Sequence, residues 1–248
     1  MRIRSIILFF LLAIPIGLLG QTYAGRLGSD WSRAAERVEE RRDGWSEVFR
    51  SLDVDATECE AIIFPEQLRF SRLQDGMEQA ALQGLYVTGG KERANFSIGL
   101  FQMKPSFVEQ VEAAWMKSPL RHEYRLYFDL KDHREQRRRR LERMQDEQWQ
   151  CVYLALFVKL MDERLPELVS MEGEERIRLL ATAYNMSFTA PLEELQAAKH
   201  RQTFHLDLFP SKSTEYYEYA GIAVEWYRNG NNRSQICEYE GLFLSLWR

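Results

Sequence analysis

The sequence predicts a mostly α-helical domain, of the α or α+β class, with at most a very short hairpin. In several segments the apolar residues recur three or four positions apart, as they do on the buried face of a helix. Strand signals are nearly absent, and the best of them is the short stretch "GLYVTGG" at 84–90. The 248 residues are 45% hydrophobic and 28% charged, which suits a folded chain with one compact domain as the default.

Four segments carry the helical pattern most clearly. Residues 29–52 begin with a Ser-Asp cap candidate, and residues 150–165 are apolar nearly all round, as expected of a central buried helix. Residues 175–185 place Ile177, Leu180 and Tyr184 on one face. Residues 214–228 form another amphipathic helix, which the "NGNNR" that follows them should end.

The net charge gives no global argument for nucleic-acid binding. It is formally −4, with a sequence pI near 5.7. The exception is an Arg-rich insertion around 129–148, where Arg137–Arg140 are surrounded by acids at helix-pairing distances. A solvated, salt-bridged helix is the favoured interpretation, and contact with an anionic wall polymer or lipid is the alternative.

The N-terminus is typical of an export signal. Arg2 and Arg4 precede an uncharged run at 5–20 that is shorter than the ~20 residues needed to span a bilayer. "TYA" at 22–24 is a small-x-small cleavage site, so we expect residues 1–24 to be a signal peptide cut near Ala24. The mature chain would then be periplasmic or secreted. An uncleaved membrane anchor is the alternative, and the membrane would be a partner only in that case.

The cysteines and histidines do not suggest a metal site. Export makes one disulfide plausible among Cys59, Cys151 and Cys237, but the sequence does not select the pair. Their spacing resembles no zinc site, and the four histidines are scattered. We therefore expect no metal and no cofactor.

Three short motifs follow one another in a distinctive order. Glu66 comes after an apolar run, Gly99-Leu100-Phe101-Gln102 forms a small-residue loop, and Ala183-Tyr184-Asn185 ends a helical segment. This order resembles that of the soluble lytic transglycosylase domain of the lysozyme-like superfamily. The resemblance covers roughly Thr57–Tyr227, and it implies a lysozyme-like domain at 57–248 preceded by a helical extension at 25–56.

The resemblance also implies an activity. Members cleave the β-1,4 bond between N-acetylmuramic acid and N-acetylglucosamine in peptidoglycan and leave a 1,6-anhydro end. Glu66 matches the catalytic Glu, which serves first as acid and then as base. The residues expected to contact the glycan strand are Ser97, Gly99, Gln102, Tyr184 and Asn185.

The chain also departs from the family pattern. Pro65 precedes Glu66, Gln67 replaces the usual Ser, Arg93 stands where a Ser is expected, and Met186-Ser187 replaces Ala-Gly. Pro65 either lies inside a helix and kinks it, or begins one. If it begins one, the helix dipole would favour the ionised form of Glu66, whereas burial against apolar neighbours would favour the protonated form.

Two other functions fit the same residues. A hydrolytic muramidase on this fold would need a second carboxylate facing Glu66, for which Asp75, Glu78 and Glu92 are candidates. A catalytically inactive wall-binding or envelope protein would instead have Glu66 pointing to water. The N-terminal helix and the Arg-rich segment exceed the motif core, so either could serve an envelope protein partner.

Overall fold

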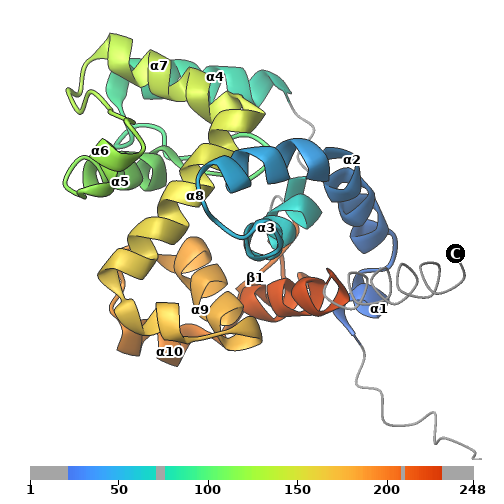
Figure 1. Cartoon of the computed structure of the whole chain (residues 1–248). Coiled ribbons are helices and arrows are strands. Elements are labelled where there is room, and N and C mark those ends of the chain that lie inside the picture. Colours follow the sequence, from blue (N-terminus) through green and yellow to red (C-terminus); the bar gives the residue numbers. More distant parts are fainter. Residues whose placement is uncertain (1–21, 71–75, 208–209, 231–248) are drawn as a thin grey trace, which may run out of the picture.

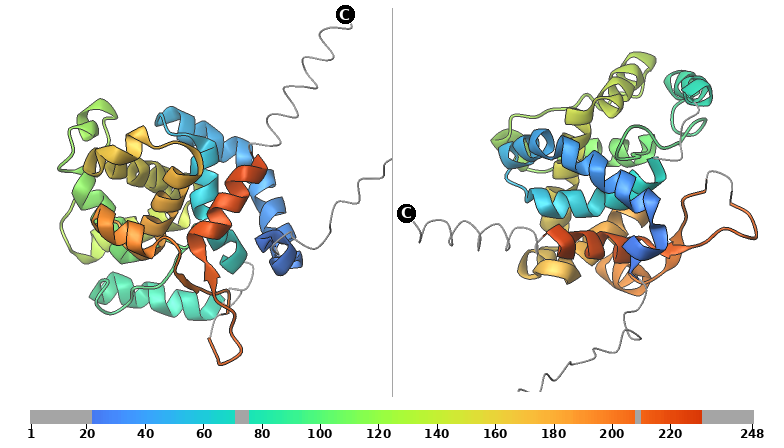
Figure 2. Two further views of the ribbon diagram at one scale, coloured as in Figure 1. Left: turned by 90° about the horizontal axis from the view of Figure 1, so that it is seen from below. Right: turned by 90° about the vertical axis from the view of Figure 1, so that its right-hand side faces the viewer.

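The fold is mostly α-helical, as the sequence predicts. Figure 1 shows the computed structural model, which describes residues 22–70, 76–207 and 210–230. Its one sheet in these residues pairs β1 (Gln202–Phe204) with β2 (Tyr217–Glu218) in antiparallel fashion. The described residues on either side of 208–209, between the two strands, project from the body of the molecule (Figure 2).

Helix α8 (Glu147–Arg164) runs through the centre. Asp146 caps it by accepting a hydrogen bond from the Trp149 amide at 2.9 Å, and almost every residue from Gln150 to Met161 is buried. The predicted central helix is therefore confirmed. Two groups of elements lie on either side of α8 (Figure 1): α4 (Gly76–Gly89), α5 (Pro105–Trp115), α6 (Leu120–Glu123) and α7 (Arg134–Gln145) on one side, and η1 (Pro166–Ser170), α9 (Gly173–Met186) and α10 (Leu192–Ala198) on the other.

Helices α2 (Ser29–Ser51) and α3 (Ala56–Phe70) complete the core. All residues of α3 from Cys59 to Leu68 are buried. The Trp31 ring meets the Phe64 ring edge-on at 4.6 Å, and Phe64 stacks on Trp226 at 3.9 Å. The N-terminal extension thus packs in the same core as the segments that carry the motifs.

A short first helix, α1 (Tyr23–Leu27), lies against the helical residues 219–230 near the C-terminus. The backbone amides of Tyr23 and Ala24 both donate to the Glu225 carboxylate at 2.8 Å. The Tyr23 ring fills the space beside Gly221, where an added Cβ would lie 2.6 Å from the tyrosine hydroxyl. The expected signal segment at 1–21 lies outside the described residues.

The Arg-rich segment forms α7, and the four arginines at 137–140 have partners within the chain. Arg137 pairs with Asp132, while Arg138 and Arg139 both pair with Glu135 on the surface. Arg140 instead enters the core, where its side chain is 5% exposed and reaches Glu112 at 2.7 Å. The prediction of a solvated helix is therefore wrong for Arg140, because a buried acid on α5 draws it inward.

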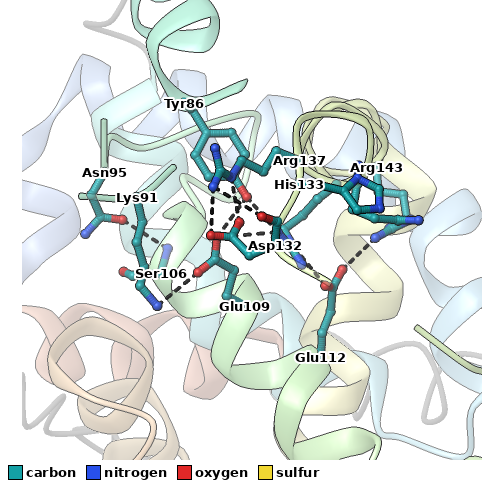
Figure 3. A network of polar contacts seen from close by, with 12 residues as sticks. Tyr86, Lys91, Asn95, Ser106, Glu109, Glu112, Asp132, His133, Arg137 and Arg143 are labelled. Carbon is teal, nitrogen blue, oxygen red and sulfur yellow. Dashed lines mark hydrogen bonds and ion pairs between the residues drawn. The ribbon is translucent and has the colours of Figure 1, made fainter. Parts of the chain in front are cut away.

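The best strand candidate of the sequence is helical in the structure. Residues 84–89 form the last turns of α4. Tyr86 is fully buried there and its hydroxyl donates to Glu109 at 3.0 Å, in the network of Figure 3. The aromatic and β-branched residues of this stretch thus pack between helices, since no neighbouring strand is present among the described residues.

The expectations about a disulfide, a metal site and a membrane anchor involve residues that the structure describes only in part. Cys59 and Cys151 are buried free thiols, and Cys237 lies outside the described residues. Within the described part of the chain, no three His, Cys, Asp or Glu side chains are grouped to hold a metal ion. No helix among the same residues has the length and apolar character needed to cross a bilayer.

Candidate active site

A polar cleft of about 310 Å³ lies between α3, the segment before α5 and the end of α9. Five of the six residues expected at the site from the sequence line it, namely Glu66, Ser97, Gln102, Tyr184 and Asn185. They come from three segments that are far apart in the chain. Gly99 belongs to the same loop but is not part of the lining.

Glu66 is the acid of this cleft. It lies in α3, is only 5% exposed, and has a pKa raised above its ordinary value mainly because burial disfavours the charged carboxylate. The nearby charges of Arg69 and Lys104 and the adjacent Tyr219 hydroxyl act in the opposite direction and lower the pKa. Burial outweighs them, so the carboxyl keeps its proton to a higher pH than an ordinary glutamate does, as suits a general acid.

Pro65 lies well inside α3, which excludes the alternative that it begins the helix. The helix dipole therefore does not act on Glu66 at a helix N-terminus. Because proline has no amide hydrogen, the Ala61 carbonyl loses its usual helical partner. One residue further on, the Tyr219 hydroxyl donates to the Ile62 carbonyl at 3.0 Å, so α3 has an outside donor where proline interrupts its hydrogen bonding.

The Gly-Leu-Phe-Gln motif forms a tight turn. Ile98 and Met103 close it with two backbone hydrogen bonds of 2.9 and 3.1 Å. Gly99 and Gln102 both have positive φ, at 72° and 50°, and glycine tolerates this conformation far better than glutamine does. The strained backbone at Gln102 holds its side chain at the cleft.

Three side chains from three helices hold the backbone of this turn. Gln67 donates to the Leu100 carbonyl at 2.7 Å, and Gln150 accepts from the Phe101 amide at 2.8 Å. Tyr184 donates its hydroxyl hydrogen to the Phe101 carbonyl at 2.7 Å. The replacement of Ser by Gln67 thus supplies a support for the turn, and Tyr184 uses its hydroxyl hydrogen to position the turn instead of donating it to Glu66.

The space beside Gly99 is filled by the Gln150 side chain and does not open into the cleft. A Cβ at this position would lie 2.1 Å from the Gln150 side-chain nitrogen. The absence of a side chain therefore lets Gln150 reach Phe101. The role expected from the resemblance, close approach of the backbone to the glycan, has no counterpart in the cleft lining of the described residues.

Substitution of Gly99 by Ala is expected to lower both stability and activity. The methyl group would displace Gln150 and leave the buried Phe101 amide without its partner, a loss of about 1–3 kcal/mol in the free energy of unfolding. Urea denaturation and glycan-cleavage assays would measure the two effects. Gly84→Ala is the matched control, because its added Cβ meets nothing within 4 Å. Equal behaviour of the two variants would contradict this role.

Gln102 offers a hydrogen-bond acceptor at the cleft. Its side-chain nitrogen donates to the Gly99 carbonyl at 2.7 Å. Its Oε1 is buried and has no hydrogen-bond partner among the described residues. A buried acceptor of this kind is costly, so a donor from a ligand, such as an N-acetyl N–H or a sugar hydroxyl, would stabilise it.

Met186 and Ser187, which differ from the family pattern, also lie at the cleft. Helix α9 ends at Met186, and Asn185, Met186 and Ser187 all contribute to the lining. The Tyr184 ring is held by edge-on contacts with Phe107 at 5.2 Å and Phe157 at 5.6 Å. Helix packing thus positions the end of α9 against the turn.

Three further residues near Glu66 were not identified from the sequence. Tyr219 is buried beside Glu66 although it lies 153 positions further along the chain, and no local pattern distinguishes it from a core tyrosine. Arg69 lies one helical turn after Glu66, with its Nη1 3.5 Å from Glu66 Oε2, and this i,i+3 spacing was a usable signal. Lys104 reaches the cleft from the position before α5.

Glu66 is the sole carboxylate among the described residues that line the cleft. Of the three candidates for a second one, Glu92 is exposed and does not line it. Asp75 and the side chain of Glu78 lie outside the described part of the structure. The arrangement therefore provides one buried acid, two cations and several amide and hydroxyl groups.

Comparisons with known proteins do not assign the chain to a family. No protein-family model matches the chain, and no curated protein or solved structure matches it either.

Proposed function

We propose that the chain is an exported lytic transglycosylase that cleaves the β-1,4 glycan of peptidoglycan. The observation that carries this proposal is the convergence of the motif segments. Glu66, Gln102 and Asn185 come from three distant parts of the chain and line one polar cleft, in which the acid is buried with a raised pKa. Motifs that matched only by chance would have no reason to meet.

One carboxyl group is sufficient for this reaction. Protonated Glu66 donates its proton to the glycosidic oxygen as the bond to C1 of the muramyl residue breaks. The 6-hydroxyl of the same residue then attacks C1, and the Glu66 carboxylate takes up the hydroxyl proton. The products are a 1,6-anhydro end and a free 4-hydroxyl on the departing sugar, and no water is consumed. Intramolecular attack benefits from proximity.

The two alternative functions fit this cleft less well. A hydrolytic muramidase needs a second carboxylate as nucleophile or base, and none of the other described lining residues is an acid. An inactive wall-binding protein would leave Glu66 facing water. Instead the carboxyl lies beside Gln102 and Tyr184 in the cleft, in a setting that favours the acid form.

Export to the periplasm or the cell exterior is part of the proposal, since that is where the substrate lies. The packing of α1 bears on the cleavage position. A cut after Ala24 would remove Tyr23, whose amide and ring contact Glu225 and Gly221. We therefore expect the mature chain to begin before Tyr23 and to retain it.

The intact mass of the secreted protein tests this expectation. A mass that corresponds to a cleaved chain with its first residue at Thr22 or a few positions earlier would agree with it, and a chain that begins at Gly25 would contradict it. A mass that includes residues 1–21 would indicate an uncleaved anchor.

The function itself is tested by incubating the purified mature chain with peptidoglycan and weighing the released sugars by mass spectrometry. Products that lack one water relative to hydrolysis are the expected result. Hydrated products would establish the muramidase instead. Absence of products from walls of several chemotypes, with folded protein, would favour the inactive envelope protein.

A further inference from the structure

The charge of the cleft is unusual for a site that binds a glycan. Arg69 on α3 and Lys104 before α5 line it together with Glu66, and no other Asp, Glu, Lys, Arg or His side chain among the described residues does so. The cleft therefore carries a net positive charge whether Glu66 is ionised or protonated. Neutral sugars give no reason for two cations at this position.

Arg69 is held in place by contacts on three sides. Its Nη1 lies 3.5 Å from Glu66 Oε2, its Nε and Nη2 donate to the His205 carbonyl at 3.4 and 3.3 Å, and its guanidinium lies over the Phe204 ring at 4.5 Å. The side chain is 25% exposed. Its charge is thus fixed at the cleft wall, and the long contact to Glu66 leaves donor capacity for another anion.

Lys104 contributes a second charge from the other wall. It is exposed, and none of the ion pairs found among the described residues includes it. Helix α5 begins directly after it and has no acidic residue in its first turn, so the positive end of the helix dipole adds to the lysine charge.

The two cations oppose the acid that they flank. Both lower the pKa of Glu66, against the effect of burial. An uncharged substrate would not change the lowering of the Glu66 pKa by the two cations. A substrate with a carboxylate would neutralise the cations and remove the opposition when it binds, which favours the protonated acid.

We propose that Arg69 and Lys104 bind a carboxylate carried by the muramyl residue of the substrate, and that the cleft thereby selects anionic over uncharged β-1,4 glycans. This inference rests on the proposed function. Two sources supply such a carboxylate. The lactyl group of a muramyl residue is free where the stem peptide has been removed, and the stem peptide has carboxylates of its own where it is present.

The test compares Lys104→Gln with wild type on three substrates: peptide-free glycan strands, peptide-bearing glycan strands, and chitin oligosaccharides, which share the N-acetylglucosamine backbone but have no carboxylate. Lys104→Gln should raise the KM for at least one muramyl substrate about tenfold, because a charge-assisted contact is lost, with a smaller change in kcat. Lys104→Arg should retain most of the affinity. Lys131→Gln is the control, since it removes an exposed lysine that does not line the cleft.

The substrate that shows the effect identifies the source of the carboxylate. An effect on peptide-free strands alone assigns the lactyl group, and an effect on peptide-bearing strands alone assigns the stem peptide. An unchanged KM on both, or an equal rise on chitin oligosaccharides, would overturn the inference while leaving the proposed function intact.

Equilibrium binding of the same strands separates a failure of the inference from a failure of the function. If wild type cleaves nothing but binds muramyl strands more tightly than Lys104→Gln does, the proposed function fails and the carboxylate site stands. Equal binding by the two proteins would overturn the site as well.

Discussion

Substitution of Glu66 by Gln is expected to reduce glycan cleavage by a factor of about 10²–10⁴, the range that positioned acid–base groups contribute. The amide keeps the size of the side chain but can neither give a proton to the glycosidic oxygen nor take one from the 6-hydroxyl. Release of anhydro sugars, followed by mass spectrometry, measures the loss. Activity within a few-fold of wild type would rule out Glu66 as the acid.

The same substitution is expected to preserve the fold. The folded-state pKa of Glu66 is raised, so the stability that its carboxyl contributes is fully present below the unfolded-state pKa and is lost as the pH rises through the folded-state pKa. At neutral pH the Gln variant should therefore be at least as stable as wild type. The alkaline limb of the wild-type pH–rate profile should likewise lie above the ordinary pKa of a glutamate, because the acid form is the active one.

Glu60→Gln provides the matched control. Glu60 lies on the same helix, is 4% exposed and also has a pKa raised mainly by burial, but it pairs with Arg42 at 3.0 Å and does not line the cleft. This variant should keep its activity, in contrast to Glu66→Gln.

The largest effect on stability is expected from substitution of Glu112 by Gln. The Glu112 carboxylate is fully buried and accepts from Arg140 and Arg143 at 2.7 Å each and from the Tyr153 hydroxyl at 2.6 Å. Figure 3 shows its contact with Arg143. Removing its charge leaves buried Arg140 with Glu109, at 3.4 Å, as its one acidic partner among the described residues. Loss of one partner from a buried ion pair costs about 3–5 kcal/mol.

Chemical denaturation measures this loss, with Glu135→Gln as the surface control. Glu135 pairs with Arg138 and Arg139, and all three side chains are at least half exposed. That variant should lose at most about 1 kcal/mol. Similar losses in the two variants would show that burial does not distinguish the Glu112 network from a surface ion pair.

The parts of the fold that the sequence predicts are those that local periodicity determines. Helices α2, α8 and α9 lie where apolar residues recur at helical spacing. Residues 214–228 are only partly helical, because Tyr217 and Glu218 pair with β1 before the helix begins at 219. That pairing depends on a partner strand that no local pattern indicates.

The burial of a charged side chain could not be predicted from the local sequence either. Arg140 lies in a run of four arginines that differ little in their sequence neighbours. Only one of the four, Arg140, meets Glu112, which lies 28 residues earlier in the chain. Whether a charged side chain is buried thus depends on which helices pack together, and the sequence pattern of α7 alone contains no such information.

The residues of the candidate site also fall into those that the sequence identified and those that it did not. The motif residues Glu66, Gln102 and Asn185 were identified because their order in the chain is itself a signal. Tyr219, which touches the acid, was not, because its role depends on how the C-terminal helix packs against α3. The support of the turn by Gln67 and Gln150 was missed for the same reason, since each residue acts on a backbone group far away in the sequence.

The central claim is that one buried acid drives an intramolecular cleavage without water. Digestion of peptidoglycan in water enriched in ¹⁸O tests it most directly, with Glu66→Gln as the background control. We expect anhydromuramyl products with no ¹⁸O in the wild-type digest and none of these products from the variant. Products with one ¹⁸O at the new reducing end, formed only by the wild type, would contradict it and establish hydrolysis.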